Sequence, residues 1–276
     1  MSEATSGGDA RAAGPGAPTA AASALPGLFD LGGRTAIVTG ASGGLGAHFA
    51  GVLADAGAHV IASARRADRL ADLASTHERI EACACDVTDA DSRAALLDAA
   101  LAHSGRVDIL VNNAGIGDAS PAETEPLEDF QRMVDVNLVS TFALAQLVGG
   151  RMLEQERGGA IVNLASMFGL VASAPLPQAS YCASKGGVVN LTRQLGAEWA
   201  RRGVRVNALA PGFFPSDMTT GIYEDERAMK WVRRNAPLGR PGELRELDGA
   251  LLLLASDAGA YIVGQTIAVD GGWTVT

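Results

Sequence analysis

The sequence predicts an α/β fold, namely a single doubly wound domain whose seven-stranded parallel sheet is flanked by helices. From Leu28 onward, short β-branched runs alternate with longer Ala- and Leu-rich segments of helical period, as expected of βαβ units. The chain has 276 residues, and a hydrophobic content of 47% is enough for one large core. We find no linker or solenoid-length repeat that would divide it.

The predicted strands are short apolar runs, and segments of helical period lie between them. They span residues 35–40, 59–64, 80–85, 107–112, 160–166, 204–210 and 265–270. The first helix is predicted within residues 43–57. Five apolar residues there share one face, namely Leu45, Phe49, Val52, Leu53 and Ala56.

The composition argues against several classes of function. The net charge of -9 repels nucleic acid and anionic lipid. No stretch offers roughly 18 uninterrupted apolar residues, so we expect no membrane span. The three cysteines lack a framework spacing, and Cys83 and Cys85 alternate along a predicted strand, so we expect a cytoplasmic protein without a metal site. Residues 1–26, rich in Ala, Gly, Pro and Ser, are predicted to be a disordered tail before the domain at 27–276.

A glycine-rich turn, TGASGGLG at residues 39–46, follows the first strand. Gly40, Gly44 and Gly46 have the spacing G-x-x-x-G-x-G. Glycines at a strand-to-helix junction allow a tight turn and let a pyrophosphate approach the helix N-terminus. A tight connection without a ligand is the alternative. The position after the first strand favours a dinucleotide site, in which we include Ser42 and Leu45.

The end of the second strand predicts which dinucleotide binds. A carboxylate there would accept a hydrogen bond from a ribose 2′-hydroxyl, whereas arginine accommodates a 2′-phosphate. The strand ends in Ala64 without a carboxylate, and Arg65 and Arg66 follow. We therefore expect NADP(H) in preference to NAD(H). The alternative is that both arginines are merely solvated at the start of a helix.

Two further turns are expected to line the same site, because they follow strands at the carboxyl edge of the sheet. Asp86 and Val87 follow the third strand, and a helix cap is the alternative role for Asp86 or for Asp89. The turn after the fourth strand, NNAG, contributes Asn113, Ala114 and Gly115.

A tyrosine and a lysine lie four positions apart in SYCASK. Tyr181 and Lys185 project from the same face of a predicted helix. Taken alone, such a pair belongs more often to a solvated helix surface than to a catalytic site. Only other motifs in the chain can favour the catalytic interpretation.

Together these motifs resemble those of the short-chain dehydrogenases/reductases, in their compact form of roughly 250 residues. The resemblance runs from about Leu31 to Trp273. It includes TGASGGLG, DV, NNAG, Asn137 in VNLVSTF, Ser166 in NLASM, YCASK, PG at 211–212 and VDGG, in the family's order. Several motifs in register are far more specific than any one of them. The resemblance implies a Rossmann-type domain and a homo-oligomer, a tetramer built partly from helices within residues 186–200 and 247–256.

The resemblance also implies a role for each site residue. Tyr181 would protonate a carbonyl oxygen or take the proton of an alcohol. Lys185 would favour the ionised phenol, whose ordinary pKa is about 10, and would hydrogen-bond the nicotinamide ribose. Ser166 would hold the substrate oxygen, and Asn137 would order a water that relays protons. The residues that follow the sixth strand near the nicotinamide would be Pro211, Gly212, Phe214 and Ser216.

The predicted function is the NADP(H)-dependent interconversion of a ketone or 3-oxoacyl group and a secondary alcohol. The alternatives are an NAD-dependent dehydrogenase of a polyol or sugar acid and a nucleotide-sensing binding protein, which would not need a tuned phenol. Residues 219–235 are expected to form a lid. The apolar loop 167–180 mildly favours a hydrophobic substrate. Five residues could either line a substrate pocket or pack, namely Phe213, Met218, Ile222, Tyr223 and Trp231.

Overall fold

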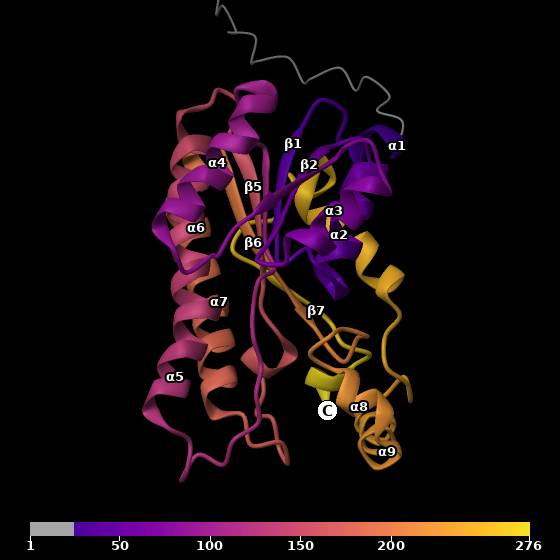
Figure 1. The fold of residues 1–276 in the computed structure, drawn as a ribbon. Coiled ribbons are helices and arrows are strands. Elements are labelled where there is room, and N and C mark those ends of the chain that lie inside the picture. Colours follow the sequence, from indigo (N-terminus) through magenta and orange to yellow (C-terminus); the bar gives the residue numbers. More distant parts are fainter. Residues whose placement is uncertain (1–24) are drawn as a thin grey trace, which may run out of the picture.

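The computed structural model describes residues 25–276 and contains the predicted seven-stranded parallel sheet (Figure 1). The strand order is β3-β2-β1-β4-β5-β6-β7, so the chain reverses direction across the sheet between β1 and β4. The strands are β1 (Thr35–Thr39), β2 (His59–Ala64), β3 (Ile80–Ala84), β4 (Ile109–Asn112), β5 (Gly159–Leu164), β6 (Val204–Pro211) and β7 (Thr266–Val269). Every predicted strand is present, and the predicted fold class is confirmed.

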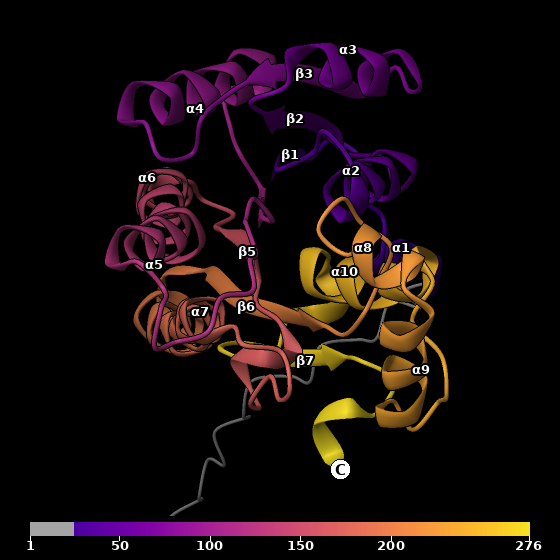
Figure 2. The same ribbon diagram turned by 60° about the horizontal axis from the view of Figure 1, so that its bottom comes forward.

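Helices cover both faces of the sheet (Figure 2). On one face α4, α6 and α7 pack on the strands, and α2, α3 and α10 cover the other. The helices are α1 (Leu25–Leu28), α2 (Gly44–Asp55), α3 (Ala67–Ser75), α4 (Ala90–Ser104), α5 (Leu127–Val134), α6 (Ser140–Glu154), α7 (Ala179–Trp199), α8 (Thr220–Glu224), α9 (Glu226–Asn235) and α10 (Asp248–Ala255). A π-helical turn, η1 (Asp135–Val139), joins α5 to α6.

The core consists of two main apolar clusters, one on each face of the sheet. Because side chains alternate along a strand, Val38 of β1 joins the cluster under α2 and α10, and Ile37 joins the cluster under α4 and α6. Phe49 of α2 and Leu144 of α6 are among the largest fully buried side chains. Each such side chain contributes roughly 2 kcal/mol by leaving water. The sheet is therefore a rigid support for the turns at its edges.

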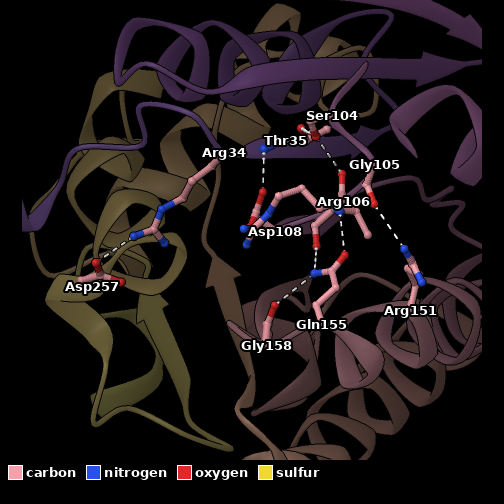
Figure 3. Close-up of polar contacts among 11 residues, drawn as sticks. Arg34, Thr35, Ser104, Gly105, Arg106, Asp108, Arg151, Gln155, Gly158 and Asp257 are labelled. Atoms are coloured by element: carbon pink, nitrogen blue, oxygen red, sulfur yellow. Dashed lines mark hydrogen bonds and ion pairs between the residues drawn. The ribbon is translucent and has the colours of Figure 1, made fainter. Parts of the chain in front are cut away.

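The amino-terminal edge of the sheet is held by buried polar contacts rather than by a ligand site (Figure 3). Asp108 accepts a hydrogen bond from the backbone N–H of Thr35 at 2.9 Å and pairs with Arg106. The side chain of Gln155 bonds both backbone groups of Val107, the N–H at 2.9 Å and the carbonyl at 2.8 Å. These contacts tie β1, β4 and the end of α6 together. The functional site is therefore expected at the opposite edge of the sheet, where the carboxyl ends of the strands lie.

One helical segment, Leu127–Glu154, is long and apolar enough to cross a membrane by length and composition. It comprises α5, η1 and α6. Its inward side chains Leu144, Val148 and Met152 are fully or almost fully buried in the core cluster. Packing against the sheet therefore explains the apolar character of its inward face. Of the predicted tail at residues 1–26, residues 1–24 lie outside the described residues. Leu25 and Pro26 belong to α1, so the predicted boundary at residue 27 is two residues late.

Candidate active site

A groove of about 880 Å³ runs along the carboxyl edge of the sheet. This is the edge at which open α/β sheets bind ligands, especially where the strand order reverses. All predicted cofactor residues line it: Gly40, Ser42, Gly44, Leu45, Gly46, Arg65, Arg66, Asp86, Val87, Asn113, Ala114, Gly115, Tyr181, Lys185, Pro211, Gly212, Phe214 and Ser216. Ser166 lines it too, whereas Asn137 lies outside its wall and is fully buried. Turns far apart in the sequence thus form one continuous surface.

The glycine-rich turn is held in place by the turn after β4. Gly40 has φ of 67°, a left-handed conformation that favours glycine. A Cβ at Gly46 would lie 2.3 Å from the Gly40 carbonyl oxygen, so no side chain fits there. Thr39 Oγ1 accepts hydrogen bonds from the backbone N–H groups of Asn113 and Ala114, at 3.1 and 3.0 Å. Thr39 is a residue that the sequence analysis missed, because one buried threonine in a strand carries no signal of its own.

The end of the groove near β2 carries the predicted phosphate-binding arginines. Arg65 is exposed at the groove. Arg66 donates two hydrogen bonds to Ser42 Oγ, at 2.8 and 3.1 Å. The same guanidinium pairs with Asp217 at 2.9 Å, and Arg69 pairs with that carboxylate at 3.3 Å. Arg66 is therefore more than a solvated side chain, and Asp217 is a second residue that the sequence analysis missed.

The two aspartates after β3 have separate roles. Asp89 is the N-cap of α4 and accepts a hydrogen bond from the backbone N–H of Ser92 at 2.7 Å. Asp86 instead accepts hydrogen bonds from the N–H and the hydroxyl of Thr88, which lower the pKa of its carboxyl group. Asp86 thus stays ionised at the groove, and the capping alternative applies to Asp89.

Tyr181 and Lys185 lie one turn apart on α7 and both face the groove. The ammonium of Lys185 lies 5.9 Å from the centre of the Tyr181 ring. It donates a hydrogen bond of 2.7 Å to the carbonyl oxygen of Leu164, at the end of β5. Burial lowers the pKa of Lys185 to about 8. The predicted adjacency of the pair is present in the structure.

The expected effect of Lys185 on the phenol is not found in the protein alone. Burial raises the pKa of Tyr181, and the hydroxyl of Ser166 only partly opposes this rise. We expected the lysine to lower it. Desolvation is the largest influence on the phenol, and the ammonium of Lys185 lies over the ring, 5.9 Å from its centre. The protein alone therefore keeps Tyr181 protonated, the form that can donate a proton.

Ser166 and Asn137 approach the pair from other elements. Ser166 follows β5, and its hydroxyl accepts a hydrogen bond from the backbone N–H of Phe168 at 3.2 Å. Asn137 lies in η1. Its amide holds both backbone groups of Ile116, at 2.8 and 2.9 Å, and donates to Ser184 at 3.1 Å. π-Helical turns occur frequently at functional sites, and this one aims a fully buried amide at the loop after β4.

The chain after β6 passes over the glycine-rich turn. A Cβ at Gly44 would lie 3.0 Å from the Cβ of Ser216, and one at Gly117 would lie 2.8 Å from the sulfur of Met218. These contacts place residues 216–219 across the groove. The segment then forms α8 and α9 (Figure 1), where we predict a lid. The position of this segment beside the groove is compatible with a lid. That the segment moves stays a prediction.

Of the five residues that could line a substrate pocket or pack in the core, some line the groove and others are packed. Met218 lines the groove. Phe213 is buried in a cluster with Phe168, Trp231 and Trp273, with ring centres 5.0 to 6.2 Å apart for the contacting pairs. Ile222 packs against this aromatic cluster, and burial raises the pKa of Tyr223 to about 12. Four of the five candidates are therefore partly or fully buried. Met167 and Phe168 are also buried, which weakens the case for a hydrophobic substrate.

Three independent observations indicate that the groove fits a dinucleotide. The glycine-rich turn lines the groove through Gly40, Gly44 and Gly46, next to the N-terminus of α2. Arg66 and Ser42 supply hydrogen-bond donors at the end of β2. Lys185 and Tyr181 lie at the far wall of the same groove. A doubly wound sheet with these features defines a nucleotide-dependent oxidoreductase that acts on carbonyl and alcohol groups.

Comparisons with known proteins agree with this class. A family model described as Enoyl-(Acyl carrier protein) reductase matches residues 40–274. The D-threitol dehydrogenase of Mycolicibacterium smegmatis is 42% identical over 90% of this chain and 95% of the relative. The 3-oxoacyl-(acyl-carrier-protein) reductase of Rickettsia felis is 38% identical over 89% of this chain and 98% of the relative. A solved structure of a gluconate 5-dehydrogenase from Burkholderia cenocepacia, in complex with NADP and tartrate, has a TM-score of 0.85 at 36% identity, covering 90% and 98%.

The chain belongs to the short-chain dehydrogenase/reductase family. It is an NAD(P)-dependent oxidoreductase that acts on CH–OH groups, and the predicted enzyme class is confirmed. The nucleotide-sensor alternative loses its support, because these relatives are named as enzymes. The remaining questions concern the cofactor, the substrate and the roles of individual residues.

Proposed function

We propose that the enzyme uses NADP(H) to interconvert a ketone and a secondary alcohol, with Tyr181 as the acid and base. One observation carries this proposal: Tyr181, Lys185 and Ser166 converge on one wall of a groove whose other end carries Ser42 and Arg66. The bound nicotinamide supplies or takes the hydride at the substrate carbon. The side chains of the protein would transfer the proton and hold the substrate oxygen.

In the reductive direction, Tyr181 transfers its phenolic proton to the substrate oxygen while the carbonyl carbon gains the hydride. A phenol with its ordinary pKa of about 10 is already protonated at neutral pH, and burial raises the pKa of Tyr181 further. Ser166, which lines the same groove, would donate a hydrogen bond to the same oxygen. In the oxidative direction the phenol must first ionise, and the positive charges of Lys185 and of the oxidised cofactor favour this step.

Lys185 and Asn137 support the proton donor. Lys185 is positioned by the Leu164 carbonyl, and its pKa of about 8 keeps the ammonium mainly charged at pH 7. Gly115 lies between them, since a Cβ there would be 3.2 Å from Asn137 Oδ1 and 3.6 Å from Lys185 Nζ. We propose that Asn137 fixes the loop after β4 through Ile116. Its role in ordering a water that relays protons to Lys185 is part of the same proposal.

The cofactor preference follows from the end of β2. No carboxylate follows β2 to accept a hydrogen bond from a ribose 2′-hydroxyl, and Arg65 and Arg66 favour a 2′-phosphate. The related gluconate 5-dehydrogenase structure was solved with NADP. NADP(H) is therefore the preferred cofactor, and NAD(H) is the alternative. The substitution Arg66→Ala should weaken NADPH binding and leave NADH binding nearly unchanged.

Two substrate classes belong in the first screen. Resemblance to a 3-oxoacyl reductase supports a ketone or 3-oxoacyl thioester. Resemblance to a threitol dehydrogenase and to a gluconate dehydrogenase supports a polyol or sugar acid. The second class is favoured by the packing of the aromatic side chains away from the groove and by the charged residues Glu128, Arg132 and Asp135 in its lining.

The test measures NADPH consumption with a ketone panel and NADP⁺ reduction with threitol, gluconate and related alcohols. Tyr181→Phe should bind NADPH with unchanged affinity and lose turnover by about 10³-fold or more, since general acid catalysis typically contributes 10²–10⁴-fold. Cys182→Ser, at the next position on α7, is the matched control and should retain activity. Full turnover by the phenylalanine variant would exclude Tyr181 as the proton donor.

A cytoplasmic homotetramer completes the proposal. Most side chains of α7 and α10 that we expected at the subunit contacts are buried or half-buried within this chain. Exposed apolar side chains lie instead at Val139 and Phe142 of η1 and α6. An isologous contact through such residues would cover them. Light scattering against the chain mass of 28.2 kDa gives the subunit number.

A further inference from the structure

A carboxylate pairs with the arginine side chains that follow β2. Asp217 belongs to the segment after β6, whereas Arg66 and Arg69 belong to the segment after β2. One oxygen of Asp217 pairs with both guanidinium groups, at 2.9 Å to Arg66 and 3.3 Å to Arg69. Arg66 also bonds Ser42 of the glycine-rich turn. Two walls of the groove therefore meet at this carboxylate.

Asp217 lies close to the backbone of the glycine-rich turn. A Cβ at Gly43 would lie 3.6 Å from both carboxylate oxygens, so Asp217 lies directly against the glycine-rich turn. Its neighbour Ser216 packs on Gly44. The ion pairs are largely solvent-exposed, and pairs of this kind contribute little to stability. An effect on the ligand that binds beside them is the more substantial consequence.

The two forms of the cofactor differ at this point of the groove. A 2′-phosphate carries up to two negative charges, so it would compete with Asp217 for Arg66 and would be repelled by the carboxylate. A ribose 2′-hydroxyl has no charge and can donate a hydrogen bond to a carboxylate. Asp217 therefore disfavours NADP(H) and is compatible with NAD(H). Its carboxylate comes from the segment after β6, whereas the carboxylate that selects NAD(H) usually comes from the end of β2.

We propose that Asp217 is a specificity-determining residue that reduces the preference for NADP(H) over NAD(H) by partly neutralising Arg66 and Arg69. The inference rests on the proposed NADP(H) dependence of the enzyme. It adds a residue from the segment between β6 and the predicted lid to the set that selects the cofactor.

The test compares the dissociation constants of NADPH and NADH for the wild type, Asp217→Asn and Glu224→Gln. The control variant removes one exposed negative charge from α8 in the same segment. Asp217→Asn should bind NADPH about tenfold more tightly and should leave NADH binding unchanged or weaker, because the variant removes a negative charge a few ångströms from the expected phosphate. A tenfold change corresponds to about 1.4 kcal/mol. Glu224→Gln should change the ratio of the two constants by less than about twofold, since its charge makes no contact with the arginines.

Ionic strength provides a second readout. The gain in NADPH affinity of Asp217→Asn should shrink as salt rises to 1 M, where the screening length falls to about 3 Å. An equal change in the affinity for both cofactors would mean a structural role and would overturn the inference. An unchanged ratio would overturn it as well.

A further variant separates this inference from the proposal beneath it. If Arg66→Ala weakens NADPH binding but Asp217→Asn leaves the ratio unchanged, the inference fails and the NADP(H) proposal stands. If Arg66→Ala leaves NADPH binding unchanged, the cofactor proposal fails, and the inference fails with it.

Discussion

Lys185 should weaken the folded protein at neutral pH, and Lys185→Met should relieve this cost. The ammonium is buried, and burial lowers its pKa from an ordinary value of 10.5 to about 8. Each tenfold change in proton affinity corresponds to about 1.36 kcal/mol, so the buried charge costs about 3 kcal/mol of folding free energy. The substitution also removes the hydrogen bond to the Leu164 carbonyl, which offsets about 1 kcal/mol of the gain.

The destabilisation by Lys185 should decrease as the pH rises. Below pH 8 both the folded and the unfolded chain carry the proton, so the full cost is present. As the pH rises through the folded pKa of about 8, the folded protein releases its proton first and the cost declines. It is gone near the ordinary pKa of 10.5. The wild type should therefore gain stability relative to Lys185→Met by about 1.4 kcal/mol per pH unit within this interval.

The assay is urea unfolding followed by tryptophan fluorescence, without cofactor, at several pH values from 6 to 10. Lys185→Met should be about 2 kcal/mol more stable than the wild type at pH 7, and the difference should fall or reverse by pH 10. Lys230→Met, which removes an exposed lysine of α9, is the control and should show no such trend. A difference between wild type and Lys185→Met that stays constant from pH 7 to 10 would refute the reasoning.

Two further predictions concern the opposite edges of the sheet. Gly46→Ala should weaken NADPH binding at least about tenfold and cost about 2 kcal/mol of stability, because its Cβ would lie 2.3 Å from the Gly40 carbonyl oxygen. The control Gly51→Ala, on the same helix with open space around the new Cβ, should stabilise by about 0.5–1 kcal/mol. Asp108→Ala should cost about 3 kcal/mol in urea unfolding with cofactor binding unchanged, because it leaves a backbone N–H of β1 and a guanidinium without their partner. Asp257→Ala removes an exposed ion pair and should cost under about 1 kcal/mol; equal losses for both aspartates would contradict this ranking.

The sheet could be predicted from the sequence because its five central strands, β2, β1, β4, β5 and β6, are buried along almost their whole length. A strand such as β1, buried at all five positions, must be a continuous apolar run, and such runs between helical segments are recognisable. The turns at the carboxyl edge could be predicted for a similar reason. Gly40 and Asn113 follow strands, and strand ends in a parallel sheet lie together. The groove residues were therefore identifiable before their geometry was known.

Other features depend on contacts that no local pattern encodes. Asp217 and Arg66 are separated by 151 positions, and neither belongs to a motif that names the other. The aromatic packing of Phe213 with Trp273 likewise joins distant segments. The burial that raises the pKa of Tyr181 could not be predicted either, because the spacing in the sequence reveals only that Lys185 is near. Burial is a property of the whole fold.

The aromatic cluster also gives this enzyme an internal optical reporter. Trp231 of α9 and Trp273 near the C-terminal end have ring centres 5.0 Å apart at an angle of 73°. Indoles this close and this steeply inclined couple electronically, so they produce a circular dichroism couplet that vanishes when they separate. Trp199 at the end of α7 is the third tryptophan of the chain, and it packs in the core cluster against α6. Displacement of α9 during turnover would thus be visible without any label.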